Sequence, residues 1–193
     1  MPPIRVACLG ASNFKKALLM ENMHTALKPY KNLIKVMATG GASVESKDCQ
    51  KSFFRQMDRL TPFEGKTIYI LFVGQNRFEK DFDLFLQKYK WAIQTLVNQV
   101  GKDNVTILLA LPRGKPREND SEFLAQQADK LAELGAELDS LGIHNLSIWE
   151  KLPGVLKKPG TLFNKKDFVH YSTPVKLYIQ QMTALAIKKH LNG

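Results

Sequence analysis

Several features of secreted, membrane-spanning or disulfide-stabilised proteins are missing from this chain of 193 residues. It has only two cysteines, Cys8 and Cys49, which are too few for a disulfide framework. Its longest apolar runs, residues 67–73 and 105–111, are far shorter than the roughly 20 residues of a membrane-spanning helix. Residues 1–5 do not show the basic start and long apolar stretch of a signal peptide. These absences predict an intracellular protein without a transmembrane segment.

Acidic residues are also scarce in the chain. Asp and Glu total 18 against 28 Lys and Arg, so the formal net charge is +10. Such an excess attracts polyanions, although a merely solvated basic surface accounts for it equally well. Hydrophobic residues make up 44% and charged residues 24% of the chain, as in an ordinary soluble globular protein. At this length we expect one domain over residues 1–193.

Sequence signals for cofactors and metals are absent as well. A nucleotide-binding protein would carry a glycine-rich or Walker-type loop after its first strand, whereas residues 10–15 read Gly-Ala-Ser-Asn-Phe-Lys. A metal enzyme needs clustered His, Cys or carboxylate ligands, and the sequence groups none. We therefore predict neither a cofactor nor a metal. The sequence carries no signal for an oligomeric state.

Apolar runs typical of strands alternate with periodic segments typical of helices. The predicted strands cover residues 4–9, 33–38, 67–73, 104–111 and 144–149. The predicted helices cover residues 13–27, 46–60, 81–100, 121–141 and 174–191. Thr173 is the expected N-cap of the last helix, since Pro174 suits the first helical position. This alternation is typical of parallel strands joined by helical crossovers.

The predicted fold is a three-layer α/β/α domain with a doubly wound, five-stranded parallel sheet. Right-handed crossovers favour the flavodoxin-like strand order 2-1-3-4-5. In that order the sheet reverses direction between strands one and three, and ligands bind beyond the carboxyl ends of the strands at that point. Ser12 follows strand one and Asn76 follows strand three. Both are therefore expected at the crevice.

Three short segments at this sheet edge supply the groups of a hydrolytic site. Ser12 is a nucleophile once a base takes its proton, and His170 can be that base. Asp167 precedes His170 by three residues, which lets the carboxylate orient the ring. Acyl transfer also needs donors for the developing oxyanion. Those donors are predicted to be the backbone N–H of Ser12, the glycine loop at residues 40–41 and the Asn76 amide.

Each residue has an alternative interpretation when taken alone. Ser12 or Asn13 can cap the first helix, and Asn76 can be an ordinary turn residue. Asp167 and His170 can be surface loop residues. The remaining histidines are expected to lie at the surface: His24, His144 and His190. The joint placement of the three segments at one edge of one sheet is what favours a catalytic site.

In this order the segments resemble the SGNH, or GDSL-type, hydrolases, whose sequence blocks carry Ser, Gly, Asn and a closing Asp-x-x-His. The resemblance spans nearly the whole chain, although each motif is short. It implies Ser12 as nucleophile, Gly41 (favoured over its neighbour Gly40) and Asn76 as oxyanion donors, and Asp167 with His170 completing the triad. The chain has Gly-Ala-Ser where Gly-Asp-Ser is usual, and Gly-Gln-Asn-Arg where Gly-x-Asn-Asp is common. Neither departure removes a catalytic group, so a serine esterase acting on an ester substrate is the favoured function.

Basic residues accumulate in the loops expected around this site, and we call them the basic rim. They are Lys15, Lys16, Arg77, Arg113, Lys115, Arg117, Lys165 and Lys166. A positive rim predicts binding of nucleic acid or of an anionic lipid surface. The resemblance points the same way, because the superfamily includes the RNA-binding domain of Oskar and esterase domains of retrotransposon-encoded proteins. An RNA- or DNA-binding domain on this fold, with or without residual esterase activity, is the alternative function.

Overall fold

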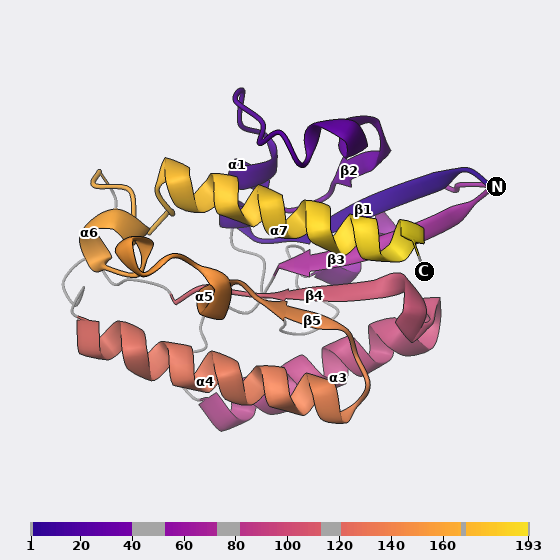
Figure 1. Ribbon diagram of the computed structural model, residues 1–193. Helices are drawn as coiled ribbons and strands as arrows, with labels where there is room; N and C mark the ends of the chain where they lie inside the picture. The colour runs from indigo at the N-terminus through magenta and orange to yellow at the C-terminus, as the bar shows by residue number, and fades with distance from the viewer. Residues whose placement is uncertain (1, 40–52, 73–81, 113–120, 167–168, 193) are drawn as a thin grey trace.

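Five strands form one parallel sheet in the order β2-β1-β3-β4-β5 (Figure 1). The structure is a computed structural model that describes residues 2–39, 53–72, 82–112, 121–166 and 169–192. The strands are β1 (Ile4–Gly10), β2 (Ile34–Val36), β3 (Lys66–Phe72), β4 (Val105–Leu109) and β5 (Asn145–Ser147). β1 and β3 pair along their whole length, from Ile4 opposite Lys66 to Gly10 opposite Phe72. The predicted three-layer fold and strand order are confirmed.

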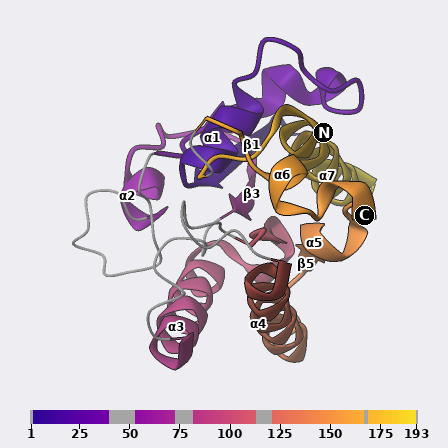
Figure 2. The ribbon, with the colours of Figure 1, turned by 90° about the vertical axis from the view of Figure 1, so that its left-hand side faces the viewer.

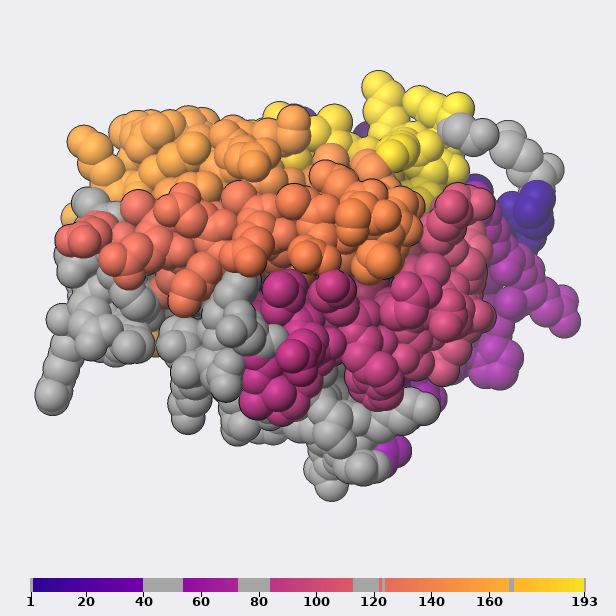
Figure 3. All heavy atoms as spheres, turned by 90° about the horizontal axis from the view of Figure 1, so that it is seen from below, coloured from indigo at the N-terminus to yellow at the C-terminus, as the bar shows by residue number. Residues whose placement is uncertain are grey.

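Helices cover both faces of this sheet (Figure 1). The longer ones are α1 (Ser12–Leu18), α2 (Phe53–Asp58), α3 (Phe82–Val100), α4 (Ser121–Ser140) and α7 (Thr173–Asn192), and the four-residue ones are α5 (Ile148–Lys151) and α6 (Pro159–Leu162). Short 3-10 turns cover Lys28–Leu33, Lys102–Asn104 and Gly154–Leu156. In Figure 2, α1 and α7 lie on one side of the sheet, and α3 and α4 lie on the other. Figure 3 shows α3 and α4 side by side across the second face.

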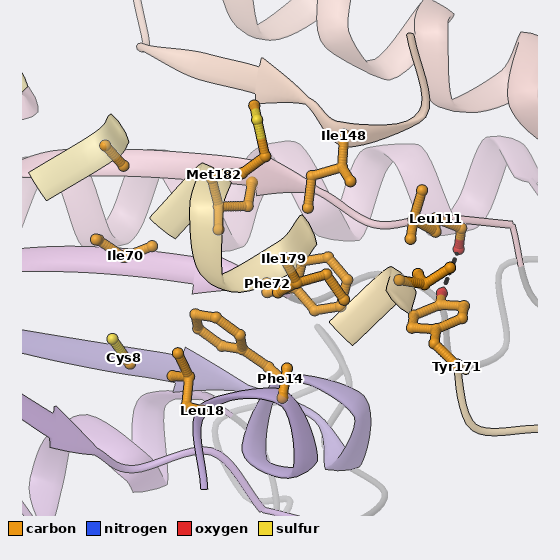
Figure 4. Close-up of a cluster of buried hydrophobic side chains, with 14 of the residues drawn as sticks. Cys8, Phe14, Leu18, Ile70, Phe72, Leu111, Ile148, Tyr171, Ile179 and Met182 are labelled. Carbon is orange, nitrogen blue, oxygen red and sulfur yellow. Dashed lines mark hydrogen bonds between the residues drawn. The ribbon is translucent and has the colours of Figure 1, made fainter. Parts of the chain in front are cut away.

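Each face of the sheet packs a separate apolar cluster, because alternate residues of a strand point to opposite faces. Val6, Cys8 and Phe72 belong to the cluster under α1 and α7 (Figure 4). Leu9 and Leu71 belong to the cluster under α2, α3 and α4. All five side chains are fully buried. The strands are therefore apolar on both faces, which is why β1 and β3 appear in the sequence as continuous apolar runs.

The strands predicted over residues 33–38 and 104–111 are shorter, at 34–36 and 105–109, and three other elements also differ from the structure. The predicted helix over residues 13–27 ends at Leu18, and the chain then turns so that Leu27 is buried. The predicted strand over residues 144–149 is shorter, because residues 148–151 form α5. α7 begins at Thr173, so Thr173 is the first helical residue and not the N-cap. Residues 46–52 of the second predicted helix lie outside the described residues.

No helix in the described parts of the chain combines the length and the apolarity that crossing a bilayer would need.

Candidate active site

The turn between β1 and α1 is fixed by a close backbone approach at Gly10. A Cβ added to Gly10 would lie 2.5 Å from the carbonyl oxygen of Phe72, the last residue of β3. Only glycine leaves room there. Gln56 of α2 is 1% exposed, and its side-chain amide accepts from the Gly10 N–H at 2.8 Å and donates to the Gly10 carbonyl at 2.9 Å. The backbone that presents Ser12 is therefore held from two sides.

Ser12 is the first residue of α1 and is half-buried. Ala11 precedes the helix in extended conformation, at φ −95° and ψ −175°, and supplies no side-chain hydrogen bond to it. Neither Ser12 nor Asn13 therefore caps the helix, and the capping interpretation is wrong. Within the described residues, the Ser12 hydroxyl has no hydrogen bond.

The side chain of Asn13 joins the start of α1 to the segment that carries His170. Its amide donates to the Val169 carbonyl at 3.3 Å, and its oxygen accepts from the Tyr171 N–H at 3.0 Å. Asn13 is 2% exposed; its hydrogen bond with Tyr171 is buried and that with Val169 is partly buried. Ser12 and His170 are thus each one residue away from this double hydrogen bond. Figure 2 shows α1 beside the segment that leads into α7.

Tyr171 anchors the same segment to the apolar core. Its ring is fully buried and lies edge-on to Phe72 at 6.5 Å, and Phe72 in turn packs against Phe14 of α1 at 5.4 Å. Its hydroxyl donates to the Leu111 carbonyl at 2.7 Å, beyond the end of β4 (Figure 4). Such aromatic pairs contribute about 0.5–1.5 kcal/mol each beyond their burial. The segment next to His170 is therefore tied to α1, β3 and β4 together.

Backbone contacts with Phe163 and Asn164 hold the His170 segment from its other side. The Asn164 N–H donates to the His170 carbonyl at 2.7 Å, and Phe163 pairs with Tyr171 in an antiparallel bridge. His170 is half-buried. Two of the three predicted triad positions, Ser12 and His170, are therefore brought to the same edge of the sheet.

The remaining predicted site residues lie outside the described residues: Gly41, Asn76 and Asp167. The last described residues before Gly41 and Asn76 lie at this edge. The Thr39 N–H donates to the Gly10 carbonyl at 3.0 Å, and β3 ends at Phe72, which pairs with Gly10. Thr39 and Phe72 therefore both lie beside the β1–α1 turn.

The structure describes four of the eight residues of the basic rim. Lys15 and Lys16 of α1, and Lys165 and Lys166 before α7, are exposed at this edge. The other members of the rim lie outside the described residues: Arg77, Arg113, Lys115 and Arg117.

A cavity of about 470 Å³ adjoins the site segment on the side of α6 and α7. Tyr171, Phe163 and Lys165 are among its lining residues, whereas Ser12 and His170 are not. This cavity is therefore a neighbour of Ser12 and His170. Across the described residues, no three His, Cys, Asp or Glu side chains are grouped to hold a metal ion.

Two residues that support the site have side-chain roles that sequence patterns did not predict. Gln56 lies in a helix without any motif, and its hydrogen bonds to Gly10 span 46 positions of the chain. Asn13 lies inside the predicted motif, but its partners are 156 and 158 positions away. Cys8, predicted to lie in a buried strand, is fully buried, and burial raises the pKa of its thiol.

Solved structures of low sequence identity share this fold over nearly the whole chain. A GDSL-like lipase from Bacteroides thetaiotaomicron superposes with a TM-score of 0.67 at 13% identity, covering 96% of this chain and 88% of the lipase. A member of the lipolytic G-D-S-L family from Veillonella parvula has a TM-score of 0.65 at 14% identity and coverages of 97% and 99%. The acetyl xylan esterase AlAXEase has a TM-score of 0.60 at 17% identity, with coverages of 96% and 98%.

The chain therefore has the fold of the GDSL-type hydrolases, and the resemblance seen in the sequence is confirmed at the level of the fold. No family model matches the chain, and no curated protein matches it in sequence.

Proposed function

We propose that the protein is a serine esterase that cleaves acyl esters at Ser12. The observation that carries the proposal is the double hydrogen bond of Asn13, since it links the residue after the nucleophile to both backbone neighbours of His170. A lone serine at a helix start has no such connection to a histidine 158 positions away. The fold shared with lipases and an acetyl xylan esterase supports the same activity.

In the proposed reaction, the Ser12 hydroxyl oxygen attacks the ester carbonyl carbon while its proton passes to His170. The developing oxyanion accepts hydrogen bonds from the Ser12 N–H, the Gly41 N–H and the Asn76 amide. His170 then donates the proton to the departing alcohol, leaving an acyl group on Ser12. Water, deprotonated by His170, hydrolyses this acyl-enzyme. Asp167 orients the His170 ring throughout and stabilises its cationic form.

Hydrolysis of short-chain acyl esters by the purified protein tests this proposal. Wild type should release alcohol from these esters, and Ser12→Ala should fold normally but lose activity by several orders of magnitude. His170→Ala should match that loss, while Asp167→Asn should lose as much or less, because a carboxylate that orients does not itself react. Most of the activity surviving in folded Ser12→Ala would refute the assignment.

We also propose that the basic rim binds polyanions, because its four described lysines are all exposed at the edge that carries Ser12. Binding of single-stranded RNA or of anionic vesicles should weaken steeply as salt rises. Charge reversal at Arg113, Lys115 and Arg117 should reduce that binding while hydrolysis of a small neutral ester barely changes. Binding that is absent, or untouched by the triple reversal, would leave the esterase proposal standing alone.

A further inference from the structure

The edge of the sheet opposite Ser12 holds a second cavity with its own polar cluster. The cavity has a volume of about 480 Å³ and lies where β3 and β4 begin, next to the last turn of α7. In Figure 1 this is the end near the label C, whereas α1 lies toward the other end of the sheet. His144 and His190 line the cavity, together with Lys66, Lys102 and Lys189.

A buried threonine connects the two histidines. The Thr106 hydroxyl is fully buried and lies 2.9 Å from Nδ1 of His144 and 2.8 Å from Nε2 of His190. The His190 ring also hydrogen-bonds to the backbone of Asp103. If His190 donates to that backbone, its neutral form has a lone pair on Nε2 and accepts from Thr106, which then accepts from Nδ1–H of His144. In this arrangement Nε2 of His144 remains able to take up a proton without breaking the chain of hydrogen bonds.

The charges around the cavity are unbalanced. Three lysines line it against one carboxylate, that of Asp103. None of the three lysines forms an ion pair with any residue in the described ranges. Burial first, and then the neighbouring lysines, lower the pKa of both histidines, and Asp139 of α4 counters this at His144. The cavity therefore has a net charge of +2 even while both histidines are neutral.

The helix dipole explains only part of this cluster. Lys189 and His190 lie in the last turn of α7, where cations interact favourably with the helix end. Lys66 comes from the start of β3 and Lys102 from the turn before β4, so neither belongs to that helix. Three separate elements thus direct positive charge into one cavity.

We propose that this cavity binds the phosphate group of a small ligand, at a site separate from the esterase site. A dianion would neutralise the net charge of +2, and its oxygens would accept hydrogen bonds from the lysine ammonium groups. It would also reverse the local field at His144, so that binding takes up a proton at Nε2 and adds a further donor. The cavity is larger than a phosphate ion needs, which leaves room for the organic part of a phosphomonoester.

The four histidines of the chain provide an internal comparison for the test. The Hε1 resonances of His24, His144, His170 and His190 are followed by NMR against pH, in sulfate and in chloride of equal ionic strength. Sulfate is the first probe, because its charge stays at −2 over the whole range. It should raise the pKa of His144 by about 1 pH unit or more, and that of His190 in the same direction. His24 should not respond.

Single-charge variants locate the binding. Lys66→Met and Lys102→Met should each remove most of the sulfate effect at His144, and both side chains are exposed, so folding is not at stake. Lys35→Met, an equal loss of charge at an exposed position on β2, is the matched control and should retain the effect. An unchanged His144 pKa in sulfate, or an equal effect in all three variants, would overturn the proposal. A response at His170 alone would also overturn it, by placing the anion at the basic rim.

Calorimetric titration separates the two sources of the phosphate group. Inorganic phosphate and ribose 5-phosphate are compared on wild type and on Lys102→Met. Tighter binding of the monoester supports a phosphorylated small molecule, and equal binding supports free phosphate. Heats that do not change in Lys102→Met would contradict the site for either ligand.

Discussion

Replacing Asn13 with alanine is the sharpest perturbation of the contact on which the proposed site rests. The change removes the hydrogen bonds that Asn13 makes with the Val169 carbonyl and the Tyr171 N–H, where Asn13 itself is 2% exposed. Each buried polar group left unpaired costs about 1–3 kcal/mol. We therefore expect Asn13→Ala to lower the free energy of unfolding by roughly 2–4 kcal/mol, allowing for some rescue by water.

A second buried amide provides a matched control for this variant. Gln180 of α7 is 0% exposed. Its side chain donates to the Ala17 carbonyl and accepts from the His24 N–H. Gln180→Ala therefore removes the same number of side-chain hydrogen bonds, here between α7 and residues 17 and 24. It should cost a similar free energy of unfolding, but it does not touch the His170 segment.

The two variants should differ in ester hydrolysis. Displacing a catalytic group by about 1 Å can cost about 100-fold in rate, so kcat of Asn13→Ala should fall by about that factor while kcat of Gln180→Ala stays close to wild type. Denaturant unfolding gives the stabilities, and initial rates on an acetyl ester are measured well below both melting temperatures. Equal kcat in the two variants would refute the reasoning that Asn13 positions His170.

Three further predictions follow from the same structure. Gly10→Ala should destabilise the fold by about 1–3 kcal/mol in denaturant titrations, because its Cβ meets a backbone oxygen at 2.5 Å, whereas Gly160→Ala, which meets nothing within 4 Å, should not. Cys8 should resist alkylation at pH 8 in the native protein and react fully in denaturant, because burial raises the pKa of its thiol. Peptide mapping that finds Cys8 alkylated in the native protein would contradict this. The pKa of His190 is lowered in the folded protein, so its contribution to stability is complete above the unfolded value of 6.5 and is lost as pH falls below it. Between about pH 7.5 and about pH 5.5, wild type should therefore lose more unfolding free energy than His190→Gln, and equal losses would contradict this.

Much of the fold could be predicted because its signals are local. β1 and β3 are continuous apolar runs, and their observed bounds lie within one residue of the predicted ones. The helix predicted over residues 13–27 was wrong beyond Leu18, because the His24 N–H is held by Gln180, a residue far away in the sequence. No local pattern reports such a contact.

The sequence did contain a signal that the last strand ends before Trp149. Ser147 and Glu150 have the spacing of a capping box, and the Ser147 hydroxyl accepts from the Glu150 N–H at the start of α5. The strand therefore ends at Ser147, and not at Trp149.

The candidate site, too, could be predicted only in part from the sequence. Ser12 and His170 were predicted from residue type and from order along a parallel sheet. The hydrogen bonds of Asn13 and Gln56, and the Thr106 bridge between two histidines expected at the surface, depend on pairs 38 to 158 positions apart. Residue type sets what these side chains can bond, but only the folded chain sets which partners they meet.

Covalent labelling of Ser12 tests the proposed catalytic role most directly. An alkyl fluorophosphonate reacts much faster with an activated serine than with an ordinary one: its phosphorus forms a bond to the Ser12 oxygen, fluoride leaves, and the serine proton passes to His170. Mass spectrometry should find one phosphonyl group per chain, on the peptide that holds Ser12, and none after the same treatment of folded His170→Ala. Absence of label on wild-type Ser12, or equal labelling of the two proteins, would contradict a nucleophile activated by His170.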